Sequence, residues 1–191
     1  MGEKNSIGDK VRLVRESRKL SVAQLAERAG LPMEGVGRIE SGTQIPSLGP
    51  LIRLARALGV RLGTFLDDQE NVGPVFVHSG ERRKVMHFSA KSDSERSDLD
   101  LFSLAANKAG RHMEPFLIDI YPSSAQDTKL SAHEGEEFIY VLSGEVEIVY
   151  GTEIHRLGAG DSIYYDSIVA HHVHCSGDRP TQILAVVYAP A

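Results

Sequence analysis

The spacing of apolar residues changes along this chain, from a helical repeat in its first third to a strand-like repeat in its last half. Ile7, Val11 and Val14 lie on one helical face, and similar spacings continue to about residue 66. From Leu101 onward, short apolar stretches recur every eight to twelve residues with Gly, Pro or Asp between them, which is typical of a β-barrel or sandwich. The sequence therefore predicts an all-α domain over residues 1–68, a linker over 69–76 and an all-β domain over 77–191.

The net charge of -5 hides a difference between these two parts. Residues 1–68 carry eleven Lys and Arg against eight Asp and Glu, a net of +3, whereas residues 69–191 carry ten against eighteen, a net of -8. A basic part followed by an acidic part indicates two modules with different partners. The lone Cys175 excludes an internal disulfide framework, and neither a membrane-length apolar run nor a signal-peptide core is present. We therefore expect a cytoplasmic protein.

Caps and breakers divide the N-terminal part into five predicted helices. Ser21 is a good N-cap for the second helix, Gly30 ends that helix, and Pro32 suits the first position of the third. A fourth helix runs to Gly59, and a short fifth element follows it. The second and third helices, joined around Gly30, have the geometry of a helix-turn-helix, whose second helix can enter the major groove of DNA.

The segments Leu25-Ala26-Glu27, Gly30-Leu31 and Arg38-Ile39-Glu40-Ser41-Gly42 resemble the five-helix domains of phage repressors of the XRE/Cro type and their bacterial relatives. The resemblance covers residues 6–68 and implies binding to double-stranded DNA. It aligns six residues with DNA-contacting positions: Ser21, Gln24, Met33, Glu34, Gly37 and Arg38. Further basic residues could contact phosphates or simply form a solvated surface, namely Lys10, Arg12, Arg15, Arg18 and Lys19.

A histidine and a carboxylate stand four residues apart at His133 and Glu137, just before an apolar run that ends in a glycine turn. In an extended segment, a spacing of four places both side chains on the same face. Gly135 would let the backbone bend so that both side chains reach one point. With His171 further along the chain, these residues form a set of metal-ligand types, and we predict that the three converge on one metal ion inside a small β-barrel.

The stretch from His133 to Gly144, followed by Gly160-Asp161 and His171, resembles the two motifs of the cupin superfamily. The resemblance implies an all-β double-stranded β-helix barrel, so the predicted chain is a five-helix helix-turn-helix domain followed by a cupin. It assigns His133, Glu137 and His171 as metal ligands and places Ser131 where the family carries another histidine. Two histidines and one carboxylate suit Fe(II), and a zinc ion with three protein ligands is also possible. Cupins without metal exist, so a metal-free binding module stays an alternative.

Polar-tipped residues of the all-β part could line a ligand pocket. The candidates are Arg111, Tyr121, Tyr140, Tyr164 and Tyr165, of which those that point inward could hold an anionic small molecule. We predict that Arg111, Tyr121 and Tyr140 line this pocket. His172 and His174 are excluded from the site, because strand alternation places them on the face opposite His171.

A repressor-type helix-turn-helix joined to a cupin resembles a family of bacterial regulators in which the cupin senses a small molecule or a metal. This implies a DNA-binding transcriptional regulator that forms a homodimer or higher homo-oligomer through its cupin. The alternative is an enzyme, since the domain order and the predicted triad also resemble hydroxypropylphosphonate epoxidase, a mononuclear non-haem iron oxygenase. We favour the regulator because the helix-turn-helix match is long and unbroken.

Overall fold

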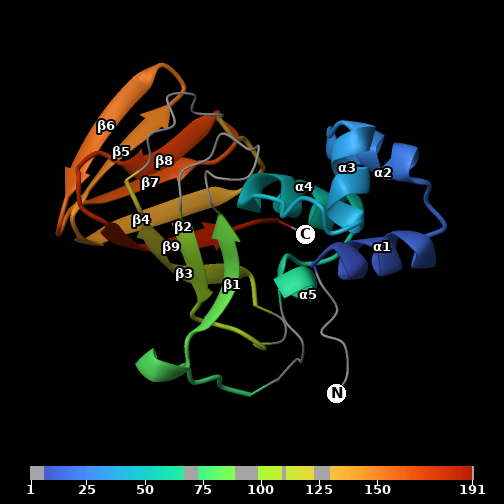
Figure 1. The fold of residues 1–191 in the computed structure, drawn as a ribbon, viewed down its shortest axis with the longest axis horizontal. Coiled ribbons are helices and arrows are strands. Elements are labelled where there is room, and N and C mark those ends of the chain that lie inside the picture. The colour runs from blue at the N-terminus through green and yellow to red at the C-terminus, as the bar shows by residue number, and fades with distance from the viewer. Residues whose placement is uncertain (1–6, 67–72, 89–98, 109–110, 123–129, 191) are drawn as a thin grey trace.

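The computed structural model describes residues 7–66, 73–88, 99–108, 111–122 and 130–190. It confirms the predicted fold class, with helices first and a β-barrel after them (Figure 1). The helices are α1 (Ile7–Ser17), α2 (Val22–Ala29), α3 (Met33–Glu40), α4 (Leu48–Ala57) and α5 (Gly63–Leu66). Among the described residues, none of the helices combines the length and the apolar character needed to cross a membrane.

The predicted caps of α2 are present in the structure. The Ser21 hydroxyl accepts a hydrogen bond from the Gln24 backbone N–H at 3.1 Å, and the Gln24 side chain accepts one from the Ser21 N–H at 2.8 Å. This reciprocal capping box satisfies two backbone donors that the helix start would otherwise leave open. Gly30 ends the helix in the left-handed region at φ 60°, which favours glycine. The sequence therefore specifies the start, the end and the turn of this motif locally.

The strands form two antiparallel sheets that face each other. One sheet has the order β1 (Arg83–Phe88), β2 (Leu99–Ser103), β3 (Met113–Ile120), β9 (Thr181–Tyr188), β4 (Glu136–Ser143), β7 (Ser162–Asp166). The other has the order β6 (Glu153–Gly158), β5 (Glu145–Tyr150), β8 (His171–Cys175). Their inner faces meet in a core whose fully buried members include Ile139, Val141, Val146, Ile148 and Ile183.

Two strand predictions differ from the structure. The residues Val75-Phe76-Val77 are typical of a short strand in composition, but they form none, and the Phe76 side chain is 79% exposed. Strand β6 is not predicted, because Arg156 and His155 interrupt its apolar alternation and much of this edge strand faces solvent. A strand with one partner has little apolar surface to bury, so its sequence pattern is weak.

Helix α4 is the helix that lies beside the end of the barrel (Figure 1). One apolar cluster includes Ile52 of this helix together with Leu101, Phe116 and Val187 of the barrel. An ion pair between Arg56 and Glu134 also joins the two parts. The helical domain therefore packs directly on the barrel through α4, and not only through the linker.

Candidate metal centre and nucleic-acid interface

The structure brings His133, Glu137 and His171 together inside the barrel. All three residues are buried, and their potential ligand atoms lie within 4.8 Å of one another. His133 Nε2 is 2.8 Å from Glu137 Oε1, and His171 Nε2 is 3.6 Å from the same oxygen. Residues from the segment before β4, from β4 itself and from the start of β8 therefore converge on one point.

Backbone pairing explains why these distant segments meet. Ser131 and His171 exchange two backbone hydrogen bonds of 2.9 Å, and His133 N–H donates to the Ser167 carbonyl at 2.9 Å. Gly135 bends the chain at φ 110°, where a Cβ atom would lie 1.9 Å from the Tyr188 carbonyl oxygen. No other residue fits this bend, since both the conformation and the close approach require glycine. The predicted role of Gly135 in bending the backbone therefore agrees with the structure.

The orientation of both imidazole rings is set by backbone carbonyls. His133 Nδ1 lies 3.2 Å from the Glu134 carbonyl oxygen, and His171 Nδ1 lies 2.8 Å from that of Val169. With Nδ1–H donating to a carbonyl, each Nε2 turns toward Glu137, and this is how metal-binding histidines are commonly held. A lone pair on Nε2 would repel the carboxylate at these distances, so a cation must lie between them, either a proton or a metal ion.

The charge of Glu137 is maintained in spite of its burial. Burial raises the pKa of this carboxyl group, but hydrogen bonds from His133, His171 and Tyr165 outweigh it and lower the pKa to about 2. The Tyr165 hydroxyl donates to Glu137 Oε2 at 2.6 Å. The pKa of Tyr165 is raised, chiefly by burial and then by the charge of Glu137, so this phenol stays protonated and acts as a donor.

This donor set fits a divalent metal ion. Two neutral imidazole nitrogens and one ionised carboxylate oxygen are ligands that both zinc and iron accept, and three protein ligands leave coordination positions open. Tyr165 supplies the additional hydrogen bond that orients a ligating carboxylate. Tyr165 is a site residue that the sequence offered only as one of five pocket candidates and that was not selected. Only the pairing of Tyr165 with Glu137 across β7 and β4 distinguishes it from its neighbour Tyr164.

The three predicted pocket residues lie away from this site. Tyr140 is on the outer face of β4 with 38% of its surface exposed, because Glu137 faces inward and strand side chains alternate. The Tyr121 hydroxyl donates to Asp100 at 3.3 Å outside the barrel. Arg111 is buried, but its Nε donates to Glu114 at 2.7 Å.

The two excluded histidines lie where the alternation places them. The rings of His172 and His174 stack on each other with centroids 5.4 Å apart, on the face of β8 opposite His171. Burial, together with the nearby His174 and His171, lowers the pKa of His172 to about 4.

The nucleic-acid interface predicted on α2 and α3 is exposed. Met33 is 60% exposed, and a Cβ atom at Gly37 would meet nothing within 4 Å. The guanidinium of Arg38 donates to Glu34 at 2.7 Å and to Gln44 at 3.0 Å. Glu34 therefore orients Arg38 on the open face of α3. Its carboxylate would also repel a DNA phosphate. Ser21 and Gln24 are also exposed, with their side chains engaged in the capping box.

Arg15, one of the suggested phosphate contacts, has a different role. It is 8% exposed, and its Nε and Nη2 donate to the two Glu40 oxygens at 2.7 and 2.8 Å. A third bond of 2.8 Å joins Nη1 to the Leu20 carbonyl. This arginine links α1 to the end of α3 inside the domain, so it cannot reach DNA.

Comparison with known proteins agrees with this architecture. Residues 11–65 match the helix-turn-helix family, and residues 117–187 match the cupin domain family. The chain is 26% identical over 182 residues to (S)-2-hydroxypropylphosphonic acid epoxidase of Streptomyces wedmorensis, covering 90% of each chain. It is 19% identical over 177 residues to the HTH-type transcriptional regulator SutR of Escherichia coli, covering 93% of this chain and 91% of that one.

A solved structure shares the whole fold. A transcriptional regulator of the same helix-turn-helix family from Vibrio cholerae superposes with a TM-score of 0.69 at 22% identity, covering 98% of this chain and 97% of the other. This superposition agrees with the order of the two domains and with the two family matches. The chain therefore combines an N-terminal helix-turn-helix domain with a C-terminal cupin domain.

Proposed function

We propose that this chain is a cytoplasmic, DNA-binding transcriptional regulator whose cupin domain senses a small molecule, a divalent metal ion, or both. One observation carries the proposal: the open face of α3 and the buried triad belong to the same chain and lie in domains that touch. Fe(II) and zinc are the metal ions that the donor set suits best. A ligand-controlled regulator needs a DNA-binding surface and a ligand-sensing site in one molecule.

Helix α4 provides the contact through which the two sites could communicate. Gly49 lies so close to the barrel that a Cβ atom there would be 2.0 Å from Ser131 Oγ and 3.6 Å from His133 Cδ2. About two helical turns further on, Arg56 pairs with Glu134. A ligand that moves the segment from Ser131 to Glu134 would therefore shift α4 and the helices packed on it. Couplings of this kind are worth about 1–3 kcal/mol.

A homodimer would allow the regulator to bind a palindromic site. Two recognition helices of a dimer are typically about 34 Å apart, one turn of DNA. The outer face of the six-stranded sheet supports pairing through the cupin, because it exposes large apolar side chains at Tyr140, Leu142, Tyr164 and Tyr188.

The test is binding of the purified chain to its own upstream DNA, measured by gel retardation and by the dependence of affinity on salt. We expect binding that weakens with salt, and a loss of roughly 1–3 kcal/mol in Arg38→Ala. Arg156→Ala is the matched control, because Arg156 is an exposed arginine of the barrel. Failure to retard any upstream fragment at low salt would contradict the proposal.

An iron-dependent oxygenase is the second candidate, favoured by the triad and by 26% identity to the epoxidase over 182 residues. The test is anaerobic reconstitution with Fe(II), followed by oxygen exposure in the presence of (S)-2-hydroxypropylphosphonate. Oxygen uptake above background would support an enzyme, and its absence would remove this candidate. Elemental analysis of protein purified without chelator separates both from a metal-free binding module.

A further inference from the structure

A hollow of about 590 Å³ opens between β6 and β7. Each of these strands is one edge of its sheet, and neither has a second partner among the described strands. The volume is in the range of small-molecule sites. None of His133, Glu137 and His171 lines the hollow, so it is a separate space from the metal centre.

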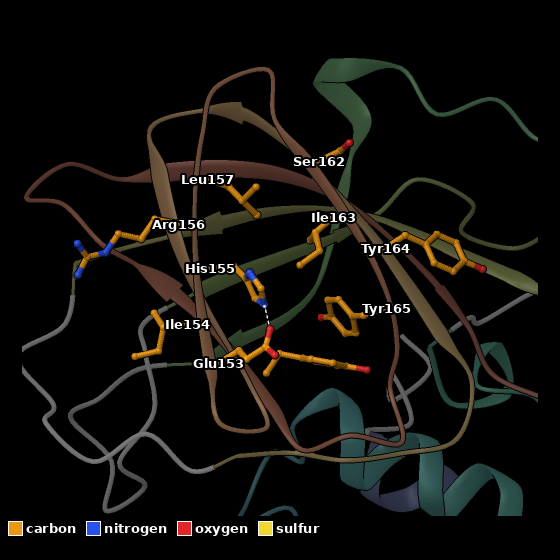
Figure 2. A pocket seen from close by; sticks show the side chains of 10 residues that line it. Glu153, Ile154, His155, Arg156, Leu157, Ser162, Ile163, Tyr164 and Tyr165 are labelled. Carbon is orange, nitrogen blue, oxygen red and sulfur yellow. Dashed lines mark ion pairs between the residues drawn. The ribbon is translucent and has the colours of Figure 1, made fainter.

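One wall of the hollow carries a carboxylate and an imidazole. In the register of the sheet, His155 pairs with Ile148 and Leu157 with Val146, and both partners are fully buried, so this face of β6 points into the barrel. Figure 2 shows His155 and Glu153 joined there by an ion pair, which measures 3.3 Å between Nε2 and Oε2. Their side chains are 40% and 72% exposed, so a molecule arriving from solvent can reach them.

The hollow also has an aromatic part that contacts the metal centre. Tyr165 of β7 and Tyr150 of β5 both line the hollow, with ring centroids 5.3 Å apart. The Tyr165 ring lies 5.1 Å from that of His171, and its hydroxyl bonds Glu137. Figure 2 shows Tyr165 pointing inward, whereas its neighbour Tyr164 points away. Tyr165 therefore forms a partition, with the hollow on one side and the triad on the other.

The charge of the hollow restricts what it can hold. Strands β4 to β9 contain a single lysine or arginine, Arg156. Arg156 is among the residues that line the hollow, but its Nε donates to Glu147 at 2.9 Å, and this carboxylate neutralises its charge. The inner wall thus offers the carboxylate of Glu153, two aromatic rings, and the apolar side chains of Leu157 and Ile163. Carboxylates attract cations, and the faces of tyrosine rings do the same.

We propose that this hollow is the effector site of the cupin, that it takes a small organic cation with an aromatic or branched apolar body, and that Tyr165 transmits its occupancy to Glu137. The inference rests on the proposed sensor function. The cationic group would lie beside Glu153 and His155, and the apolar body would contact Tyr150, Leu157 and Ile163. A ligand that shifts the Tyr165 ring would change the hydrogen bond that Tyr165 donates to Glu137 Oε2. This change would alter the metal centre, which lies against α4 at His133.

The first experiment compares three probes with the same ring and different charge, by calorimetry and amide NMR on the full chain without DNA. They are 2-phenylethylamine, which is cationic at neutral pH, 2-phenylethanol and phenylacetate. We expect the amine to bind about fivefold more tightly than the other two, and Glu153→Gln to remove this preference. Glu145→Gln is the control, since it removes the same charge from an exposed position on β5.

Equal or tighter binding of phenylacetate would overturn the proposal, and so would unchanged amine binding in Glu153→Gln. Absence of shifts in the β6 and β7 amides at millimolar amine would also overturn it. Because DNA is absent, these outcomes are independent of whether the chain is a regulator. A chain that binds the amine but no DNA would contradict the proposed function and leave the effector site intact.

The second experiment tests Tyr165 as a positioning residue. In protein loaded with Co(II), we expect 2-phenylethylamine to change the visible absorption spectrum of the metal. Tyr165→Phe should still bind the amine, because its ring remains, but the spectral change should disappear. An identical spectral change in Tyr165→Phe would show that the hydroxyl does not transmit occupancy. Tyr140→Phe is the control, because Tyr140 lies on the outer face of β4 and belongs neither to the lining of the hollow nor to the triad.

Discussion

Each domain buries one cluster of charged groups, and the two clusters are built differently. In the helical domain, Arg15 donates to both oxygens of Glu40 and to a backbone carbonyl. In the barrel, the Nε2 atoms of His133 and His171 turn toward one oxygen of Glu137, at 2.8 and 3.6 Å. In the cluster around Arg15 and Glu40, hydrogen-bond donors meet acceptors. In the triad of His133, Glu137 and His171, several acceptor atoms point at one position.

This difference separates a structural role from a binding role. A buried ion pair with complete hydrogen bonding needs no further partner, and removing one member leaves the other charge unpaired. Converging lone pairs instead require a cation, so the triad is complete only when a proton or a metal ion is present. Substitutions should therefore affect folding in the helical domain and metal binding in the barrel.

The largest expected effect on stability is that of Glu40→Ala. The change would leave the Arg15 guanidinium buried without its carboxylate, and we expect a loss of about 3–5 kcal/mol in the free energy of unfolding. Urea denaturation measures it. Glu16→Ala is the matched control, because Glu16 also lies near Arg15, at 3.5 Å, but its side chain is 62% exposed. Equal effects of the two changes would show that the buried pair is not special.

Glu137→Gln should weaken metal binding more than it weakens folding, the reverse of what we expect for Glu40→Ala. We expect the affinity for zinc to fall by more than the roughly 10–100-fold that loss of an outer-shell partner costs, since a ligand itself is lost. The metal-free protein should lose less than about 2 kcal/mol of stability, because glutamine keeps the shape and one acceptor. Competition with a chelator measures the affinity. Glu136→Gln, on the outer face of the same strand, should leave it unchanged.

Tyr165→Phe tests whether the hydrogen bond to Glu137 supports the metal centre. We expect the affinity for zinc to fall by about 10–100-fold, the usual effect of removing an outer-shell partner. The same chelator competition measures it. Unchanged affinity would mean that the burial of Glu137 and the two histidines suffices to orient the carboxylate.

The smallest expected effect concerns Arg56 and Glu134, the charged pair between the domains. Their side chains are 55% and 40% exposed, so solvent screens the attraction. We expect a coupling energy of about 0.2–1 kcal/mol from a double-mutant cycle with Arg56→Ala and Glu134→Ala. A coupling several times larger would indicate that this pair, and not the apolar contacts of α4, holds the domains together.

Much of the helical domain could be predicted because its signals are local. The capping box at Ser21 and the left-handed turn at Gly30 depend on residues within one turn of the helix. The burial of Arg15 could not be predicted, because Glu40 is twenty-five residues away and only the packing of α1 on α3 brings it near. The apolar spacing identifies buried faces, but it does not identify a buried charge.

In the barrel, the alternation of strand side chains predicts part of the candidate site, and it also argues against one of the predicted pocket residues. The spacing that places His133 and Glu137 together is visible in the sequence, and the same alternation places Tyr140 on the opposite face. Strand β6 could not be found in this way, because its edge position weakens the pattern, and with it Glu153 and His155 were missed. Tyr165 became identifiable only from its register with Glu137.

The sequence by itself determined the two domains, the helix-turn-helix, and the three residues that converge in the barrel, because periodicity, caps and motif spacing are local properties of the chain. The tertiary structure decided which buried polar groups are fully hydrogen-bonded and which still need a partner, such as a cation. It also decided that Gly49 of α4 lies against Ser131 and that Tyr165 separates a hollow from the triad. These contacts join residues far apart in the chain, and they depend on how sheets and helices pack.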